Sequence, residues 1–463
     1  MRLANHEIHQ PIKSDLVIEF AKQELTSYSG LELIKRYFRI IGLNHRVRQA
    51  FRAHELSGDY TVIDVILVFV ALWLVGGDRL RHVEWIASDP LVQRLCELAK
   101  LPNYRTLSRR LLQFTNDSLQ ALVTLNSQIV FDKLEELGLG TITLEFDGTV
   151  LSCGEKVAWA FRGYNPQNRH AKSYYPLLCH IAQTGHFLQV KNRPGNVYDG
   201  KSFALSLIRD CVDQVREKLP QVRIEVRLDS AFFQQEILKY LYRENILFAV
   251  KVPMCKWLRL KETINARNRW HWASEKLAWF KSSLQLECWD MEIGLTFFRE
   301  KISDRPKKGH QFDLFTPDDG IYEFSVICST MNLTAPHLLD FYNGRCAMEH
   351  AISEFKGEFG FASIPTHCYQ ANSAYQQISV MAHNLVRNFQ IDTNLTVPRK
   401  PGVSRTNVLK FNSLKTLRLE WINVAGRIVN TDGKRRLKLN HCEIREEKFQ
   451  KMSHALDKLR AVA

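Results

Sequence analysis

Four polar residues follow one another at helical spacing in the C-terminal half of the chain. Tyr342, Arg345, Glu349 and Lys356 are separated by three, four and seven positions. On an α-helix such side chains lie along one stripe of the surface. This stripe carries a carboxylate, two cations and a phenol, and no aliphatic residue. We therefore expect it to hold a charged ligand.

Two aspartates end segments that we expect to be buried strands. Asp147 ends Thr-Ile-Thr-Leu-Glu-Phe-Asp, and Asp229 follows Ile-Glu-Val-Arg-Leu. With Glu349 they supply the carboxylates of a two-metal phosphoryl-transfer site, in which two ions about 4 Å apart hold the attacking and leaving oxygens. Mg²⁺ suits such a site because it prefers oxygen ligands and keeps several waters, and Mn²⁺ is an expected substitute. In this interpretation Asp147 bridges both ions, and Asp229 and Glu349 each complete one side.

Each acid also has an ordinary structural interpretation. Asp147 precedes a glycine and is consistent with a turn, and Asp229 is consistent with a helix cap. Glu349 is consistent with a surface ion pair to Arg345, four residues earlier. Among the functional contacts, we expect Arg345 and Lys356 to bind DNA phosphate, and Tyr342 to pack on a sugar or donate to a phosphate.

Two further glutamates compete with Glu349 for the role of the helical acid. Glu354 and Glu358 lie five and nine positions after it. At about 100° per residue, both point away from the stripe that carries Glu349. Helix geometry therefore favours Glu349.

The order of the expected elements provides a frame for these acids. Residues 138–252 predict three strands, a helix, a strand, a helix and a strand: Thr141–Phe146, Tyr174–Ile181, His186–Lys191, Gly200–Lys218, Val222–Leu228, Gln234–Glu244 and Ile246–Val252. This is the order of a ribonuclease-H-like α/β fold, whose first and fourth strands present acids side by side. Other α/β sheets fit the same order.

The segment that carries the third acid, Glu349, lies further along the sequence than a ribonuclease-H-like fold requires. Residues 253–333 contain five tryptophans and alternating runs such as Cys288–Phe298, which predict a β-rich insertion. Most of the tryptophans are expected in the core, and some could stack on an unpaired base. Residues 334–395 complete the catalytic core, with one helix over Pro336–Phe359. Residues 396–463 form a basic C-terminal region with a hairpin at Gly426–Leu439.

Residues 1–137 predict an all-helical N-terminal DNA-binding region. Helical spacing is expected over Leu16–Leu25, Gly30–Ile41, Val62–Val75, Pro90–Ala99, Arg105–Phe114 and Ser118–Leu137. The helices on either side of Leu101-Pro-Asn103 resemble a helix-turn-helix. Its second helix would bring Arg105, Arg109 and Arg110 to DNA, although most short helix pairs are packing units only.

The composition limits the partners and the cellular compartment that we expect for this protein. A formal net charge of +14 favours a polyanionic partner such as DNA. The ten cysteines are scattered, which indicates free thiols in a reducing compartment. Val62–Val75 is short for a membrane span and carries Asp64, so it is expected to be a core helix. We therefore expect a cytoplasmic protein with no membrane contact.

The residues also resemble a known family. Tyr342, Arg345, Glu349 and Lys356 reproduce the Tyr-x2-Arg-x3-Glu-x6-Lys signature of bacterial insertion-sequence transposases of the DDE class. The runs Gly163–Leu178 and Arg193-Pro-Gly-Asn196 are similar to the insertion-sequence thirteen-eighty family. So are Leu101-Pro102 and Thr106-Leu-Ser-Arg109. The similarity extends from about residue 60 to residue 440, and the first fifty or so residues match nothing we can name.

The resemblance implies cut-and-paste transposition. It implies a ribonuclease-H-like core interrupted by a β-rich insertion, Asp147, Asp229 and Glu349 as the catalytic triad, and Mg²⁺ as cofactor. It also implies binding of terminal inverted repeats, strand cleavage, joining to target DNA, a dimer that pairs the two ends, and a place at the bacterial nucleoid. Two alternatives stay open: a catalytically inactive DNA-binding descendant of a transposase, and a structure-selective nuclease.

Overall fold

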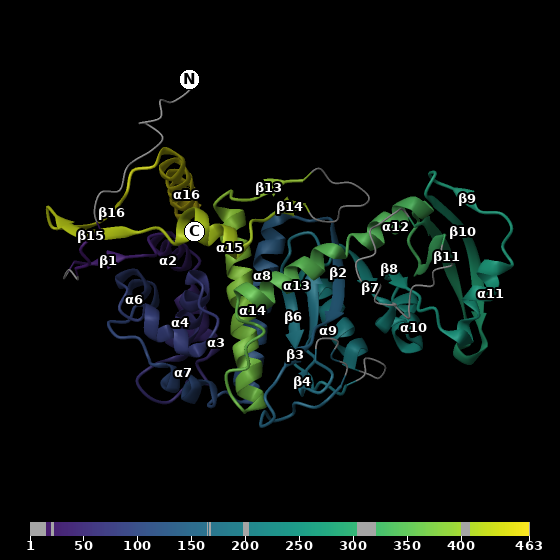
Figure 1. Cartoon of the computed structure of the whole chain (residues 1–463), viewed down its shortest axis with the longest axis horizontal. Helices are drawn as coiled ribbons and strands as arrows, with labels where there is room; N and C mark the ends of the chain where they lie inside the picture. Colours follow the sequence, from purple (N-terminus) through teal and green to yellow (C-terminus); the bar gives the residue numbers. More distant parts are fainter. Residues whose placement is uncertain are drawn as a thin grey trace, which may run out of the picture.

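A nine-stranded mixed sheet organises the molecule (Figure 1). The computed structural model describes residues 15–19, 23–163, 165, 168–197, 203–302, 321–399 and 408–462. The sheet has the order β6-β5-β2-β7-β8-β12-β11-β10-β9. Its strands are β2 (Thr141–Gly148), β5 (Leu177–Ile181), β6 (Phe187–Lys191), β7 (Arg223–Leu228), β8 (Leu247–Lys251), β9 (His271–Trp272), β10 (Leu277–Leu286), β11 (Met291–Lys301) and β12 (Tyr322–Ser329). Strands β2, β7 and β8 are parallel to one another, and the other pairings are antiparallel. The predicted mixed α/β class is confirmed.

The two faces of β2 differ in chemistry because its residues alternate. Ile142, Leu144 and Phe146 are fully buried in one apolar cluster with α9 (Phe203–Lys218) and α10 (Gln235–Arg243). The residues between them, Thr143, Glu145 and Asp147, point to the opposite face. That face is polar, and it is the face from which the candidate site is built.

The segment predicted as a β-rich insertion contains four strands of the same sheet. Strand β12 pairs antiparallel with β8, and β11, β10 and β9 follow in turn. The insertion therefore continues the sheet from its β8 edge. One expected strand was too long: Glu287–Trp289 is a 3₁₀ turn, and β11 begins at Met291. Between β8 and β9 lies α11 (Leu260–Asn265).

The helix expected over Pro336–Phe359 is two helices, α12 (Ala335–Asn343) and α13 (Cys346–Glu358). In a continuous helix the Phe341 carbonyl would accept from the N–H of Arg345. Here it accepts from Gly344 and from the Arg227 guanidinium, and Arg345 N–H donates to Tyr342 instead. A Cβ at Gly344 would lie only 2.5 Å from Arg227 Nη1. The break is therefore set by Arg227, and the expectation of one helix was wrong.

The N-terminal residues fold as a helical layer. Its helices are α2 (Leu31–Ile40), α3 (Leu43–Ala50), α4 (Val62–Val75), α5 (Val83–Ile86), α6 (Pro90–Cys96), α7 (Tyr104–Leu111) and α8 (Asn116–Leu137). Helix α4 is buried along its whole length apart from Asp64, as expected of a core helix. Among the described residues, no helix is both long and apolar enough to cross a bilayer. The helix expected at Leu16–Leu25 was wrong, since residues 16–19 are not helical and Leu25–Thr26 forms strand β1.

The proposed helix-turn-helix gains no support from its packing. Helix α6 packs mainly against α2 and α4. Helix α7 packs against the turn at Leu80–His82 and against α14 (Tyr369–Asp392). Because the two helices rest on different neighbours, DNA binding by this pair stays a prediction.

Helix α14 lies between the helical layer and the sheet (Figure 1), in contact with α8, α4 and β6. Beyond it lie β13 (Val397–Pro398), β14 (Leu409–Lys410), α15 (Leu414–Leu417), the π-helix Arg418–Ile422, β15 (Gly426–Thr431), β16 (Lys434–Leu439) and α16 (Glu443–Val462). The predicted hairpin is confirmed: β15 pairs with β16 around Asp432-Gly433, both at positive φ. A short pair, β3 (Leu151–Ser152) with β4 (Ser173–Tyr174), follows β2. All ten cysteines are free, as expected.

Candidate active site

Asp147 and Asp229 lie side by side at the ends of neighbouring parallel strands. The last register pair of β2 and β7 joins Phe146 to Leu228, and each aspartate is the next residue of its chain. Neighbouring strands are about 4.8 Å apart. The Asp147 side chain is 20% exposed and that of Asp229 is 30% exposed. Both carboxylates are thus shielded yet open to a ligand.

A guanidinium joins the two carboxylates. Arg345, at the start of α13, places Nη2 3.3 Å from Asp147 Oδ2 and 4.0 Å from Asp229 Oδ2. Its side chain is buried, and its pKa is raised: burial opposes its charge, but Asp147, Tyr342 and Asp229 outweigh that effect. Tyr342 hydrogen-bonds to Arg345, and burial raises its phenol pKa. In the protein without DNA, Arg345 therefore contacts the two aspartates. We expected it to contact a DNA phosphate beside them.

The surroundings of Asp147 disfavour the negative charge of its carboxylate. Its pKa is raised to about 7, chiefly because burial disfavours the anion. Arg345 acts in the opposite direction, while the charges of Asp229 and Glu349 raise the pKa further. Asp147 therefore binds a proton near neutral pH, and a divalent cation would replace that proton with a larger charge.

Glu349 belongs to the same electrostatic cluster. It lies in the first turn of α13, is exposed, and makes no ion pair or side-chain hydrogen bond with any described residue. Arg345 pairs with the two aspartates instead, which removes the ordinary interpretation of Glu349 as its ion-pair partner. Asp147 and Asp229 retain their local roles as well: Asp147 accepts from the N–H of Gly148, and Asp229 caps a short helix by accepting from Ala231.

The competing glutamates face other partners. Glu354 pairs with Arg387 of α14 at 2.6 Å and accepts from the N–H of Leu414. Glu358 pairs with Arg418. Both point away from the aspartates, as helix geometry predicted.

Lys356 donates hydrogen bonds to the loop that follows Asp147. Its Nζ donates to Thr149 Oγ1 at 3.1 Å and to the carbonyl of Val150 at 3.0 Å. Burial lowers the pKa of this amine. Lys356 thus ties the end of α13 to the loop after β2, and its expected contact with phosphate stays a prediction.

Sequence reasoning missed a buried ionic network beneath the acids. Arg227 Nε donates to Glu145 Oε1 at 2.8 Å, and His180 Nδ1 lies 2.8 Å from Glu145 Oε2. All three side chains are buried. The pattern that could have found them is period two: Glu145 precedes Asp147 by two residues, and Arg227 precedes Asp229 by two, so all four share one face.

The N-terminal arginines separate into two environments. One cavity of about 840 Å³ is lined by four arginines, Arg79, Arg81, Arg105 and Arg109. Arg110 lies elsewhere, with its guanidinium against the backbone of Gly58, where an added Cβ would be 2.1 Å away. The structure thus brings Arg105 and Arg109 together and leaves Arg110 apart.

Tryptophans of the insertion reach the segment after Asp229. Trp289 packs on Phe233, with ring centroids 5.2 Å apart, and Trp257 packs on Trp289 at 5.5 Å. Trp257 is half exposed. Trp270 packs on Phe280, in line with the expectation of core packing. Trp257 is therefore a surface-accessible ring in the insertion.

The carboxylate oxygens of Asp147 and Asp229 are suitable ligands for a hard divalent cation. Within the described ranges, no three His, Cys, Asp or Glu side chains are already grouped closely enough to hold a metal ion. Asp147 and Asp229 nevertheless share one cationic partner, and their oxygens are the ligands that Mg²⁺ prefers. Burial raises the pKa of Asp147 to about 7 even with Arg345 beside it.

We expect Asp147→Asn to stabilise the metal-free protein at pH 8 by up to about 4 kcal/mol. Because the folded pKa of about 7 lies above the ordinary value of 3.8, the unfolded chain loses this proton first as the pH rises. Stability therefore falls between about pH 4 and pH 7, and the full cost is present at pH 8. Urea unfolding with EDTA at pH 8 and pH 4.5 measures the difference, with the exposed Asp457→Asn as control. An equal effect at both pH values would contradict the assignment.

Comparison with known proteins places the chain in a family. The family model "Transposase DDE domain group 1" matches residues 9–461. No curated protein matches. Among solved structures, the chain is similar to the piggyBac transposase synaptic complex with hairpin DNA, at 10% identity and a TM-score of 0.43, over 93% of this chain and 81% of that one. The Mos1 transposase paired-end complex with left transposon end gives 10% identity and a TM-score of 0.18, over 34% and 52%. Because the family model spans nearly the whole sequence, the chain belongs to the family of DDE transposases that this model describes.

Proposed function

We propose that this protein catalyses metal-dependent cut-and-paste transposition of an insertion sequence. The observation that carries the proposal is the pair Asp147 and Asp229 on adjacent parallel strands, joined by Arg345 and faced by the helix of Glu349. The strand order β6-β5-β2-β7-β8 is that of a ribonuclease-H-like core, with the first and fourth strands adjacent. In this proposal the three acids are the catalytic triad.

Each residue has a role in that reaction. Asp147 and Asp229 would hold divalent cations, with Glu349 completing the ligand set from α13. Bound Mg²⁺ would activate water and neutralise charge on the scissile phosphate. Arg345 pairs with both aspartates in the free protein and would turn to a phosphate oxygen on DNA. Tyr342 orients Arg345, and Lys356 holds the loop after Asp147.

The charge distribution supports DNA as the substrate. The chain carries a net charge of +14, and four arginines without acidic partners among the described residues line the cavity at α7. Such sites bind phosphates irrespective of sequence. We propose that the N-terminal region helps to bind terminal inverted repeats, that a homodimer pairs the two ends, and that the freed 3′ hydroxyl attacks target DNA.

An excision and joining assay tests this function. The substrate is the DNA that flanks the gene, with Mg²⁺ or with EDTA, and the proteins are wild type and Asp229→Asn. We expect cleavage at the element ends and joining to target only by wild type with Mg²⁺. Cleavage of branched DNA without joining would make the protein a nuclease. Binding without any cleavage would make it an inactive descendant.

A further inference from the structure

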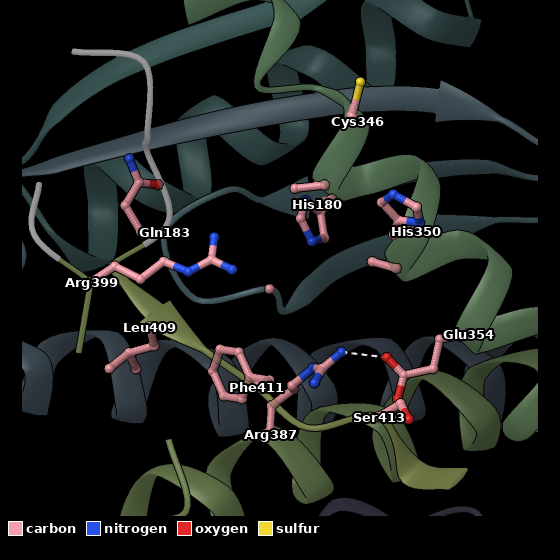
Figure 2. A pocket seen from close by; sticks show the side chains of 13 residues that line it. His180, Gln183, Cys346, His350, Glu354, Arg387, Arg399, Leu409, Phe411 and Ser413 are labelled. Atoms are coloured by element: carbon pink, nitrogen blue, oxygen red, sulfur yellow. Dashed lines mark hydrogen bonds and ion pairs between the residues drawn. The ribbon is translucent and has the colours of Figure 1, made fainter. Parts of the chain in front are cut away.

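A second cavity lies against the face of α13 that carries His350 and Glu354 (Figure 2). Its volume is about 540 Å³. His350 lines it from α13, Gln183 and Gly185 from the β5–β6 turn, Arg387 from α14, and Arg399 and Phe411 from the segments around β13 and β14. Five separate stretches of the chain therefore converge on it, and none of its lining residues belongs to the triad.

Arg387 presents an unused donor in this cavity. Its Nη2 donates to Glu354 at 2.6 Å, and its guanidinium lies over the ring of Phe411 at 4.7 Å. Its Nε is buried and has no hydrogen-bond acceptor. A buried donor without an acceptor is destabilising. Gly185 borders this guanidinium, since a Cβ there would lie 3.7 Å from Nε.

His180 presents a second unpaired nitrogen. The ring is 1% exposed, and Nδ1 contacts the carboxylate of Glu145 at 2.8 Å. Its Nε2 is buried without a partner, and the side chain lines the same cavity.

The charges around the cavity favour an anion. Arg387 and Arg399 each bring a guanidinium cation to the cavity. Glu354 is the single acid among the lining residues, and it is already engaged by Arg387 and by the N–H of Leu414. A tetrahedral phosphate in the cavity would lie beside both guanidinium groups and accept from their N–H donors.

We propose that this cavity binds a backbone phosphate of the DNA strand that is cut, a few nucleotides from the scissile bond. The inference rests on the proposed function. His350 is the residue after Glu349, and His180 pairs with Glu145, two residues before Asp147. His350 and Glu354 point about 100° and 140° away from Glu349 around α13, so the cavity lies across this helix from the acids.

The first test measures binding of an octamer of thymidylate by fluorescence anisotropy at low salt. Arg399→Gln and His350→Gln remove lining groups and leave the Arg387–Glu354 pair intact. Lys410→Gln is the matched control, because Lys410 is exposed on β14, pairs with Val397 in register, and does not line the cavity. We expect Arg399→Gln to weaken binding by about tenfold and Lys410→Gln by less than about twofold. Equal losses in the two variants would overturn the proposal.

The second test locates the phosphate. Element-end duplexes carry one neutral methylphosphonate at successive positions. We expect one position near the cut to weaken binding by wild type and to have no further effect in Arg399→Gln. Additive losses at every position would overturn the proposal. So would inorganic phosphate that competes as well as the octamer, because the cavity would then bind free phosphate. Loss of octamer binding in the cavity variants of a protein that cannot cleave would support the cavity and reject the transposase function.

Discussion

Glu349→Gln is expected to lower strand cleavage at element ends by about 10³-fold or more and to leave DNA binding intact. The substitution keeps the size of the side chain and removes the charge that completes the ligand set. Glu349 has no partner among the described residues, so the free energy of unfolding should change little. Single-turnover cleavage with Mg²⁺ measures the rate, and anisotropy measures binding.

Glu358→Gln is the matched control for that result. Glu358 lies on the same helix, nine positions on, but pairs with Arg418. We expect it to lose about 1 kcal/mol of stability and to cleave at nearly the wild-type rate. Equal cleavage by wild type and Glu349→Gln would remove Glu349 from the site, and Glu354 would then be the remaining acid of α13 to examine.

Arg227→Ala should lower the free energy of unfolding by about 3–5 kcal/mol, the largest effect on stability that we expect. Arg227 and Glu145 are both fully buried. Removing the guanidinium leaves the Glu145 carboxylate with His180 alone and deprives the Phe341 carbonyl of one of its two donors. Urea unfolding followed by tryptophan fluorescence measures the loss.

A double variant separates lost charge pairing from lost packing. Glu145→Leu combined with Arg227→Met removes both buried charges and keeps much of the volume. We expect it to recover at least half of the stability that Arg227→Ala loses, because no uncompensated charge is left in the interior. If the double variant is as unstable as the single one, the contribution of Arg227 is packing and its bond to Phe341.

The parts of the fold that follow local rules could be predicted from the sequence. The alternation in Thr141–Asp147 predicts a strand with one polar face, and the positions of Asp147 and Asp229 predict acids at neighbouring strand ends. The exclusion of Glu354 and Glu358 followed from helical angles alone. The strand and the helical angles need only the geometry of a single element, whereas the placement of the two acids also needs the order of the strands.

The features that sequence analysis missed depend on partners that are distant in the sequence. The break at Gly344 is caused by Arg227, which takes the carbonyl of Phe341 from another element. The contact of Arg345 with both aspartates requires that break, because the residue sits at the start of the second helix. Edge pairing of β12 with β8 joins strands across the expected domain boundary, and local alternation cannot specify such a partner.

The continuous sheet also fixes the distance between Asp147 and the insertion. From β2, which carries Asp147, to β10 of the insertion there are five interstrand steps. At about 4.8 Å each they span about 24 Å, or roughly seven base pairs of duplex at 3.4 Å. Because hydrogen bonds join every pair of neighbouring strands, this distance does not depend on a flexible linker. The number of strands therefore sets the distance between Asp147 and the outer strands of the insertion.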